Sequence, residues 1–168
     1  MRFFLSVEFV ESVTDPLYLT SLGVISERGT ELYVVNPDHC DMAALSMDRD
    51  HMPLIASSAE IGPMLRQFVL RDGAGSRPHF YGYCCAYDWV AVCNLYGGST
   101  RMPKEFPLYC SDVRQMYEML DKPALPPKPG HCDAIGGARW VKDAWLCMVK
   151  AAASEGRPEG EMAGLQRR

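Results

Sequence analysis

The sequence predicts an α/β fold in which a mixed central sheet of five or six strands is flanked by helices. Three apolar stretches follow one another at the start of the chain, in residues 1–11, 18–26 and 29–36. Short polar links separate them, which is typical of an antiparallel meander. Further along, an apolar strand over residues 79–85 leads directly into a helix over residues 86–95. This mixture of strands and helices is typical of two-layer or three-layer α/β domains.

The first long helix is predicted from its cap and from its apolar spacing. Ser57 and Glu60 have the separation of a capping box. Apolar residues then recur at helical spacing: Ile61, Leu65, Phe68 and Val69. We expect this helix to pack across the sheet. Residues 36–51 before it are interpreted as a short helix and loop, and residues 53–58 as a connecting segment.

Three more helices are expected in the second half of the chain. The helix over residues 86–95 is followed by Gly97 and Gly98, which is a strong signal for a helix end. A further helix is predicted over residues 110–122, and a last one from about residue 133 to residue 152. The proline-rich stretch between these two is interpreted as an extended connector.

The length and composition indicate one domain. We assign residues 1–152 to it and expect the tail, residues 153–168, to be disordered, because the tail has few apolar residues. No stretch approaches the 18 apolar residues of a membrane span. The seven cysteines show no paired spacing, which favours a reduced, cytoplasmic setting.

The charge balance gives no overall basic footprint. The net charge is −4 and the isoelectric point is about 5.5, whereas proteins that bind nucleic acid tightly are usually basic. Cations gather loosely in two places along the chain: Arg66, Arg71 and Arg77, and then Arg101 with Lys104. From the sequence alone we interpret them as solvated faces.

Three segments carry residues that suggest chemistry. The first strand, MRFFLSVEFVE, holds Ser6 and Glu8, and alternate residues of a strand point to the same face. The segment YGYCCAYDWVAVCNLYGG carries Asp88 at the start of a helix, and HCDAIGGARW begins the last helix. In this order and spacing the three segments resemble the DEDDh branch of the DEDD 3'-5' exonucleases. The small single-domain exoribonucleases of bacteria and phages are the members that they resemble most.

The resemblance implies an RNase H-like fold and a site in which four carboxylates and a histidine base serve two divalent ions, Mg²⁺ or Mn²⁺. In this sequence Glu8 and Asp88 keep two of the carboxylates. Three positions of the motif have changed: Ser6 stands at the first aspartate, Gly137 at the last aspartate and Cys132 at the histidine.

An alternative alignment takes His131 as the base, one residue out of register. Gly136 then stands at the position of the last aspartate, so both alignments place a glycine there. A glycine has no side chain to bind a metal ion, and a neutral hydroxyl is a poor magnesium ligand. We therefore predict a degenerate site made of Glu8, Asp88 and His131, with metal bound, if at all, by Glu8 and Asp88.

Aromatic residues flank the remaining aspartate. Tyr87 and Trp89 are candidates for stacking on nucleobases, because aromatic faces accept any base. For Trp89, packing in the core is the alternative.

Two functions follow from these residues. The first is a catalytically degenerate exonuclease-like protein that needs no cofactor and acts by binding RNA or DNA 3' ends or a protein partner. The alternative is a divergent Mg²⁺-dependent or Mn²⁺-dependent 3'-5' exoribonuclease. Both readings expect no membrane contact, and both leave a homodimer open.

Overall fold

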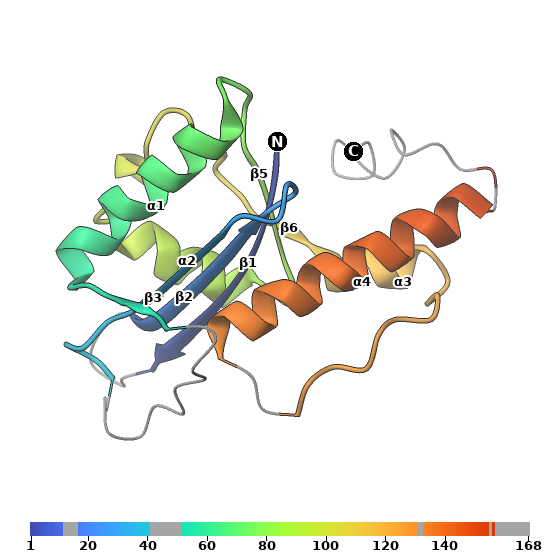
Figure 1. Ribbon diagram of the computed structural model, residues 1–168, viewed down its shortest axis with the longest axis horizontal. Helices are drawn as coiled ribbons and strands as arrows, with labels where there is room; N and C mark the ends of the chain where they lie inside the picture. Colours follow the sequence, from blue (N-terminus) through green and yellow to red (C-terminus); the bar gives the residue numbers. More distant parts are fainter. Residues whose placement is uncertain (12–16, 41–51, 131–132, 155, 157–168) are drawn as a thin grey trace.

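The computed structural model of the chain describes residues 1–11, 17–40, 52–130, 133–154 and 156. Within these residues, six strands form one mixed sheet with the order β4-β3-β2-β1-β5-β6, and four α-helices flank it (Figure 1). The predicted α/β class and the mixed sheet flanked by helices are confirmed.

The first three strands form the predicted meander. Strand β1, Arg2–Val10, pairs antiparallel with β2, Tyr18–Ser26, and β2 pairs antiparallel with β3, Glu31–Val35. On its other side β1 pairs in parallel with β5, His79–Gly82. Strand β1 therefore lies in the middle of the sheet.

Two short strands were not predicted. Strand β4, Leu54–Ile55, pairs in parallel with β3 in a stretch expected to be a connecting segment. Strand β6, Ser111–Asp112, pairs in parallel with β5 and occupies the start of the helix expected over residues 110–122. A two-residue strand is too short to show a period of two, so the sequence has no pattern from which to predict it.

The helix after β6 is shorter than expected. Helix α3 spans Val113–Met119, and its cap is Asp112, whose carboxylate accepts a hydrogen bond of 2.8 Å from the Arg114 backbone N–H. The helix expected within residues 36–51 falls largely on residues 41–51, which lie outside the described residues.

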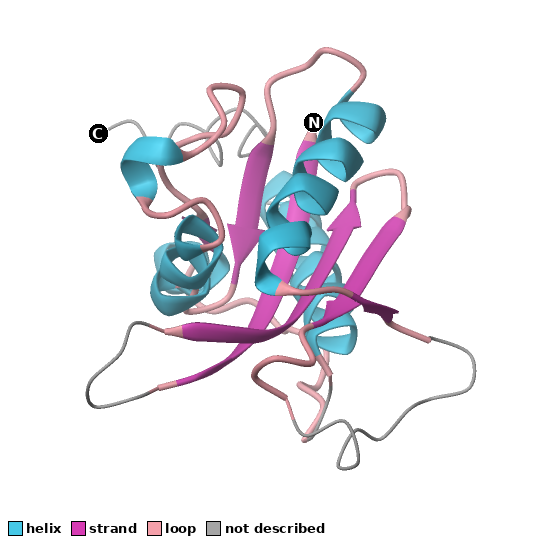
Figure 2. Cartoon of the chain, turned by 90° about the vertical axis from the view of Figure 1, so that its left-hand side faces the viewer, coloured by secondary structure: helices cyan, strands magenta, loops and turns pink. Residues whose placement is uncertain are grey.

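The two faces of the sheet carry different helices. Helix α1, Ser58–Gly73, and helix α2, Ala86–Asn94, pack on one face, and α4, Ala134–Ser154, lies with α3 on the other. Figure 2 shows α1 in front of the sheet and a long helix behind it. The predicted packing of the first long helix across the sheet is confirmed.

Strand β1 supplies both layers of the core through its alternation. Phe3 and its odd-numbered neighbours Leu5 and Val7 face the layer of α1 and α2, whereas Phe4 faces α3 and α4. Phe3 and Phe4 are 0% and 1% exposed, and burying such a side chain contributes about 2 kcal/mol. The even-numbered positions that follow Phe4 are Ser6 and Glu8, so the face toward α4 becomes polar toward the end of the strand.

The connector and the last helix are close to expectation. Trp140 donates a hydrogen bond of 3.1 Å from its indole N–H to the Pro126 carbonyl, which holds the connector against α4. Helix α4 ends at Ser154, two residues beyond the predicted end, and residues 155 and 157–168 of the tail lie outside the described residues. In the described part of the chain, no helix is long and apolar enough to cross a membrane.

Candidate active site

Glu8 and Ser6 lie on the face of β1 that α4 covers. Their partners across the antiparallel ladder are Ser21 for Glu8 and Gly23 for Ser6. The Ser21 hydroxyl donates a hydrogen bond of 2.6 Å to Glu8 Oε2. Ser21 is only 1% exposed, whereas Glu8 is exposed. The carboxylate of Glu8 is therefore held at the sheet by a buried hydroxyl and is open to solvent.

Asp88 approaches β1 from the opposite helical layer. The turn between β5 and α2 contains Cys84 with φ of 53°, a left-handed conformation that is uncommon outside glycine. This turn places Asp88 in the first turn of α2. Its carboxylate accepts a hydrogen bond from the backbone N–H of Val7, which stands between Ser6 and Glu8. We call Ser6 and Glu8 on β1, together with Asp88 beside the Val7 backbone, the acidic site.

Burial changes the ionisation of Asp88. Removal from water raises the pKa of its carboxyl from 3.8 to about 7, and the nearby charge of Asp112 adds to this rise. The hydrogen bond from Val7 and the charge of Lys128 act in the opposite direction. A carboxyl whose pKa is strongly raised by burial is a common feature of functional sites.

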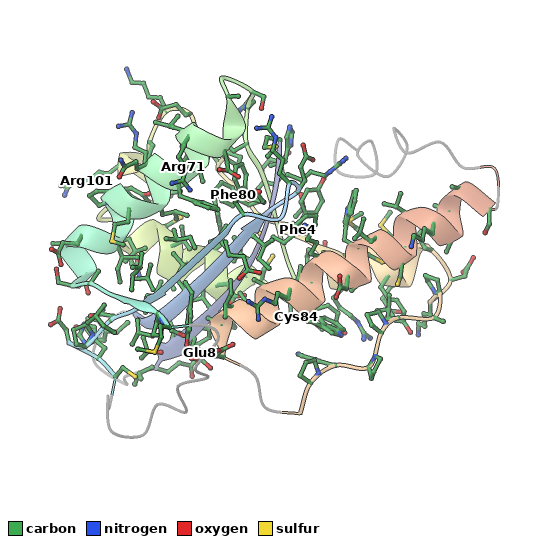
Figure 3. The ribbon with its side chains drawn as sticks, viewed as in Figure 1. Phe4, Glu8, Arg71, Phe80, Cys84 and Arg101 are labelled. Carbon is green, nitrogen blue, oxygen red and sulfur yellow. The ribbon has the colours of Figure 1, made fainter. Side chains whose placement is uncertain are left out.

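The start of α4 lies directly on the sheet beside this site. A Cβ atom built on Gly23 would stand 2.2 Å from the Ala134 carbonyl oxygen, so only glycine permits the contact. Because Gly23 is the ladder partner of Ser6, the first turn of α4 lies over the residue next to Ser6. Gly137 follows Ala134 by one helical turn, in agreement with its expected origin in the last helix. Figure 3 shows Glu8 near the start of α4.

Two contacts hold this end of α4 in place. The Asp133 carboxylate accepts a hydrogen bond of 2.8 Å from the Gly136 N–H, so Asp133 acts as the cap of the helix. Arg139 binds Glu31 of β3 with two hydrogen bonds, 2.9 Å from Nε and 2.7 Å from the terminal nitrogen. A bidentate pair of this kind is strong and directional.

Tyr33 is a neighbour of the site that the sequence did not indicate. It is the ladder partner of Gly23, so Ser6, Gly23 and Tyr33 form one row across three strands. Burial raises the pKa of the Tyr33 hydroxyl to about 12, and the negative charges of Asp133 and Glu8 contribute to the rise. The alternation of residues in strands 18–26 and 29–36 could have pointed to this row, but only with the register known.

The two aromatic candidates beside Asp88 lie in different surroundings. Trp89 is 7% exposed, its ring centroid lies 5.1 Å from that of Phe80, and its indole N–H donates to the Leu108 carbonyl at 3.1 Å. Trp89 is thus a core residue and offers no face to a nucleobase, because the helical period turns it toward the sheet. Tyr87 is 59% exposed and lies 6.1 Å from the Phe9 ring, so its face is accessible.

The described residues do not fit a site for two metal ions. Among them, no group of three or more His, Cys, Asp or Glu side chains could hold a metal ion. Two hard divalent ions held about 4 Å apart need several oxygen ligands, and Glu8 and Asp88 supply only two carboxylates. His131 and Cys132 lie outside the described residues.

A mixed α/β sheet with carboxylates at the end of its central strand is consistent with an exonuclease fold. The chain is 33% identical, over 149 residues, to two proteins of Mycobacterium tuberculosis that are each named 3'-5' exoribonuclease. They are Rv2179c of strain ATCC 25618 / H37Rv and MT2234.1 of strain CDC 1551 / Oshkosh, and the match covers 83% of this chain and 88% of each relative. The chain therefore belongs to this family of 3'-5' exoribonucleases. No protein-family model matches it.

Proposed function

We propose that the chain binds the 3' end of RNA at the acidic site and that hydrolysis there is lost or strongly weakened. The observation that carries this proposal is the composition of the site. Glu8 lies on β1 and Asp88 accepts a hydrogen bond from the Val7 backbone of the same strand, whereas serine and glycine stand at the two positions where carboxylates were expected, Ser6 and Gly137. On this proposal the chain has the RNase H-like fold of the DEDDh branch without its full set of metal ligands.

RNA is the proposed ligand because the names of both relatives state that they are exoribonucleases. The exposed ring of Tyr87 gives a surface on which a terminal base can stack. Partial protonation of Asp88 near neutral pH lowers the negative charge at the site, which reduces repulsion of a phosphate. Binding of a DNA 3' end or of a protein partner stays a prediction. So do the formation of a homodimer and a cytoplasmic location.

The second candidate function is a divergent 3'-5' exoribonuclease that depends on Mg²⁺ or Mn²⁺. The relatives support this candidate more directly than the first, since their names state the activity itself. Glu8 and Asp88 are the described residues that would bind a metal ion in such an enzyme.

A 5'-labelled, single-stranded RNA of 20 nucleotides separates the two candidates. The protein is incubated with it in Mg²⁺ and in Mn²⁺, and shortening is followed on a sequencing gel. Binding is measured on the same RNA, and on DNA of the same sequence, by fluorescence anisotropy. Glu8→Gln is compared with Asp143→Asn, which removes an exposed carboxylate from α4.

The first candidate expects bound RNA that keeps its full length, with affinity changed by Glu8→Gln and not by Asp143→Asn. Metal-dependent shortening that Glu8→Gln abolishes and Asp143→Asn leaves intact would establish the second candidate. If the protein neither binds nor shortens the RNA, both candidate functions are overturned.

A further inference from the structure

A groove lies far along the sheet from the acidic site, between α1 and the segment over residues 95–105. Its volume is about 910 Å³. A smaller hollow of about 290 Å³ continues it toward the end of α1 and shares three of its lining residues, which are Leu70, Lys104 and Glu105. We call the two hollows together the basic groove. Figure 3 shows two of its residues, Arg71 and Arg101, beside α1 and away from Glu8.

The basic groove gathers the cations that the sequence had shown only as two loose groups. Its cationic lining residues are Arg66, Arg71, Arg77, Arg101 and Lys104. All five side chains are exposed, and Glu105 is the one acidic residue among the described residues that line the groove. The chain as a whole carries a net charge of −4, so positive charge is concentrated here.

Most of this positive charge is not compensated by ion pairs with acidic residues that line the groove. Arg66 forms an ion pair of 2.6 Å with Glu105, which neutralises one cation. Arg71 forms a longer ion pair of 3.7 Å with the buried Asp72 carboxylate, which also accepts a hydrogen bond from the Thr30 hydroxyl. Among the described residues, Arg77, Arg101 and Lys104 form no ion pair. A concave surface with an excess of one charge focuses the electrostatic potential and attracts ligands of the opposite sign.

The lining favours a phosphodiester chain over a protein partner. Stable protein interfaces depend on aromatic or large apolar anchors at their centre. Of the large exposed hydrophobic side chains in the described part of the chain, Leu70 alone lines the groove. Leu95, Tyr96 and Met102 also line the groove but are partly buried, whereas its arginine and lysine side chains are exposed. Exposed cations of this kind are typical of surfaces that contact a nucleic-acid backbone.

A third hollow connects the groove with the end of β1. It measures about 230 Å³ and shares Ala59 and Leu95 with the groove. At its other end it is lined by Tyr18, the ladder partner of Val10, which lies two residues beyond Glu8. Adjacent hollows that share lining residues therefore lead from the cations along α1 to Tyr18, near the end of β1 that carries Glu8.

We propose that the basic groove binds the sugar-phosphate backbone of RNA upstream of the 3' end held at the acidic site. This inference rests on the proposed function, because it takes RNA as the ligand. It adds a second binding surface that makes affinity depend on the length of the RNA. A short oligonucleotide occupies the acidic site alone, and a longer one also reaches the groove.

The expected effect follows from counterion release. For single strands, the logarithm of the binding constant falls with the logarithm of the salt concentration with a slope of about −0.7 per neutralised phosphate. Removing three cations should make this slope shallower by about 2, which corresponds to about 100-fold weaker binding at 0.1 M salt.

The test variant combines Arg77→Gln, Arg101→Gln and Lys104→Gln and leaves the ion pairs of Arg66 and Arg71 intact. The control variant combines Arg28→Gln, Lys122→Gln and Lys150→Gln. These three cations are also exposed, lie outside the groove and change the net charge equally. Affinities for a 4-nucleotide and a 20-nucleotide RNA are measured by fluorescence anisotropy between 50 and 400 mM salt. Circular dichroism checks that both variants are folded.

The inference expects the test variant to lose about 100-fold in affinity for the 20-nucleotide RNA while its affinity for the 4-nucleotide RNA stays unchanged. The control variant should bind both as the wild type does. Equal affinities of the test and control variants for the long RNA would overturn the inference that the basic groove binds RNA, and would leave the proposed function unchanged. Failure of the wild type to bind either RNA would instead overturn the proposed function and the groove with it. Displacement of the long RNA by polyglutamate at the same charge concentration would show an acidic-protein site and would also overturn the inference.

Discussion

Replacing Asp88 by asparagine should change how the stability of the fold depends on pH. In the folded protein the pKa of Asp88 is raised from 3.8 to about 7 by burial. Between about pH 4 and pH 7 the folded state therefore holds a proton that the unfolded chain has released. The free energy of unfolding falls as the pH rises through this range, because the unfolded state binds fewer protons.

The size of the effect follows from the pKa values. Each pKa unit is worth about 1.4 kcal/mol, so ionising Asp88 costs the folded protein up to about 4 kcal/mol, of which about 3 kcal/mol falls between pH 5 and pH 8. Asparagine has nearly the same shape and its amide oxygen can still accept the hydrogen bond from Val7. Asp88→Asn should therefore remove the charge penalty and keep the local geometry.

Urea denaturation at pH 5 and pH 8 measures this difference. From pH 5 to pH 8, Asp88→Asn should gain up to about 3 kcal/mol of unfolding free energy relative to the wild type. Asp143→Asn, on the exposed side of α4, should show no comparable gain. Equal behaviour of the two variants would refute the argument that burial at β1 controls Asp88.

Two further predictions concern the end of α4. Ser6→Asp combined with Gly137→Asp should create a site for Mn²⁺, because it adds carboxylates to Glu8 and Asp88 at the two positions where the resemblance expects them. Isothermal titration calorimetry should detect heat that the wild type lacks, and equal heats would contradict the assignment of these positions. Gly23→Ala should lower the free energy of unfolding by about 2 kcal/mol or more, because its Cβ meets the Ala134 backbone. Gly73→Ala is the control, since a Cβ there has nothing within 4 Å, and an equal loss in both variants by thermal denaturation would contradict the close contact.

Most of the fold could be predicted because its elements have clear local signals. The meander was readable from three apolar stretches, and α1 from a cap at Ser57, whose backbone N–H donates to the Glu60 carboxylate at 2.9 Å. Strands β4 and β6 were missed because each has two residues, and their place is set by pairing with distant strands. The start of α3 was missed for the same reason. The residues before it fit a helical pattern, but Ser111 and Asp112 pair with β5 in the sheet.

The candidate site was readable only where its residues follow one another in the chain. Alternation in β1 was enough to place Ser6 and Glu8 on one face. The pairing of Ser21 with Glu8 and the row through Tyr33 depend on strand register, which the sequence does not state. The interpretation of Trp89 depended on which side of α2 meets the sheet, a tertiary property that local spacing leaves open. The basic groove was missed because its cations come from segments about 30 residues apart.

The way in which α4 is held against the sheet has a consequence for how the acidic site can change in evolution. The helix is positioned by the missing Cβ of Gly23, by the Asp133 cap and by the pair between Arg139 and Glu31. None of these contacts requires an ion, so the architecture does not depend on catalytic ligands for its integrity. If the proposed function holds, carboxylates at the positions of Ser6 and Gly137 could be lost without unfolding the protein, and the same scaffold would still present its surface to RNA.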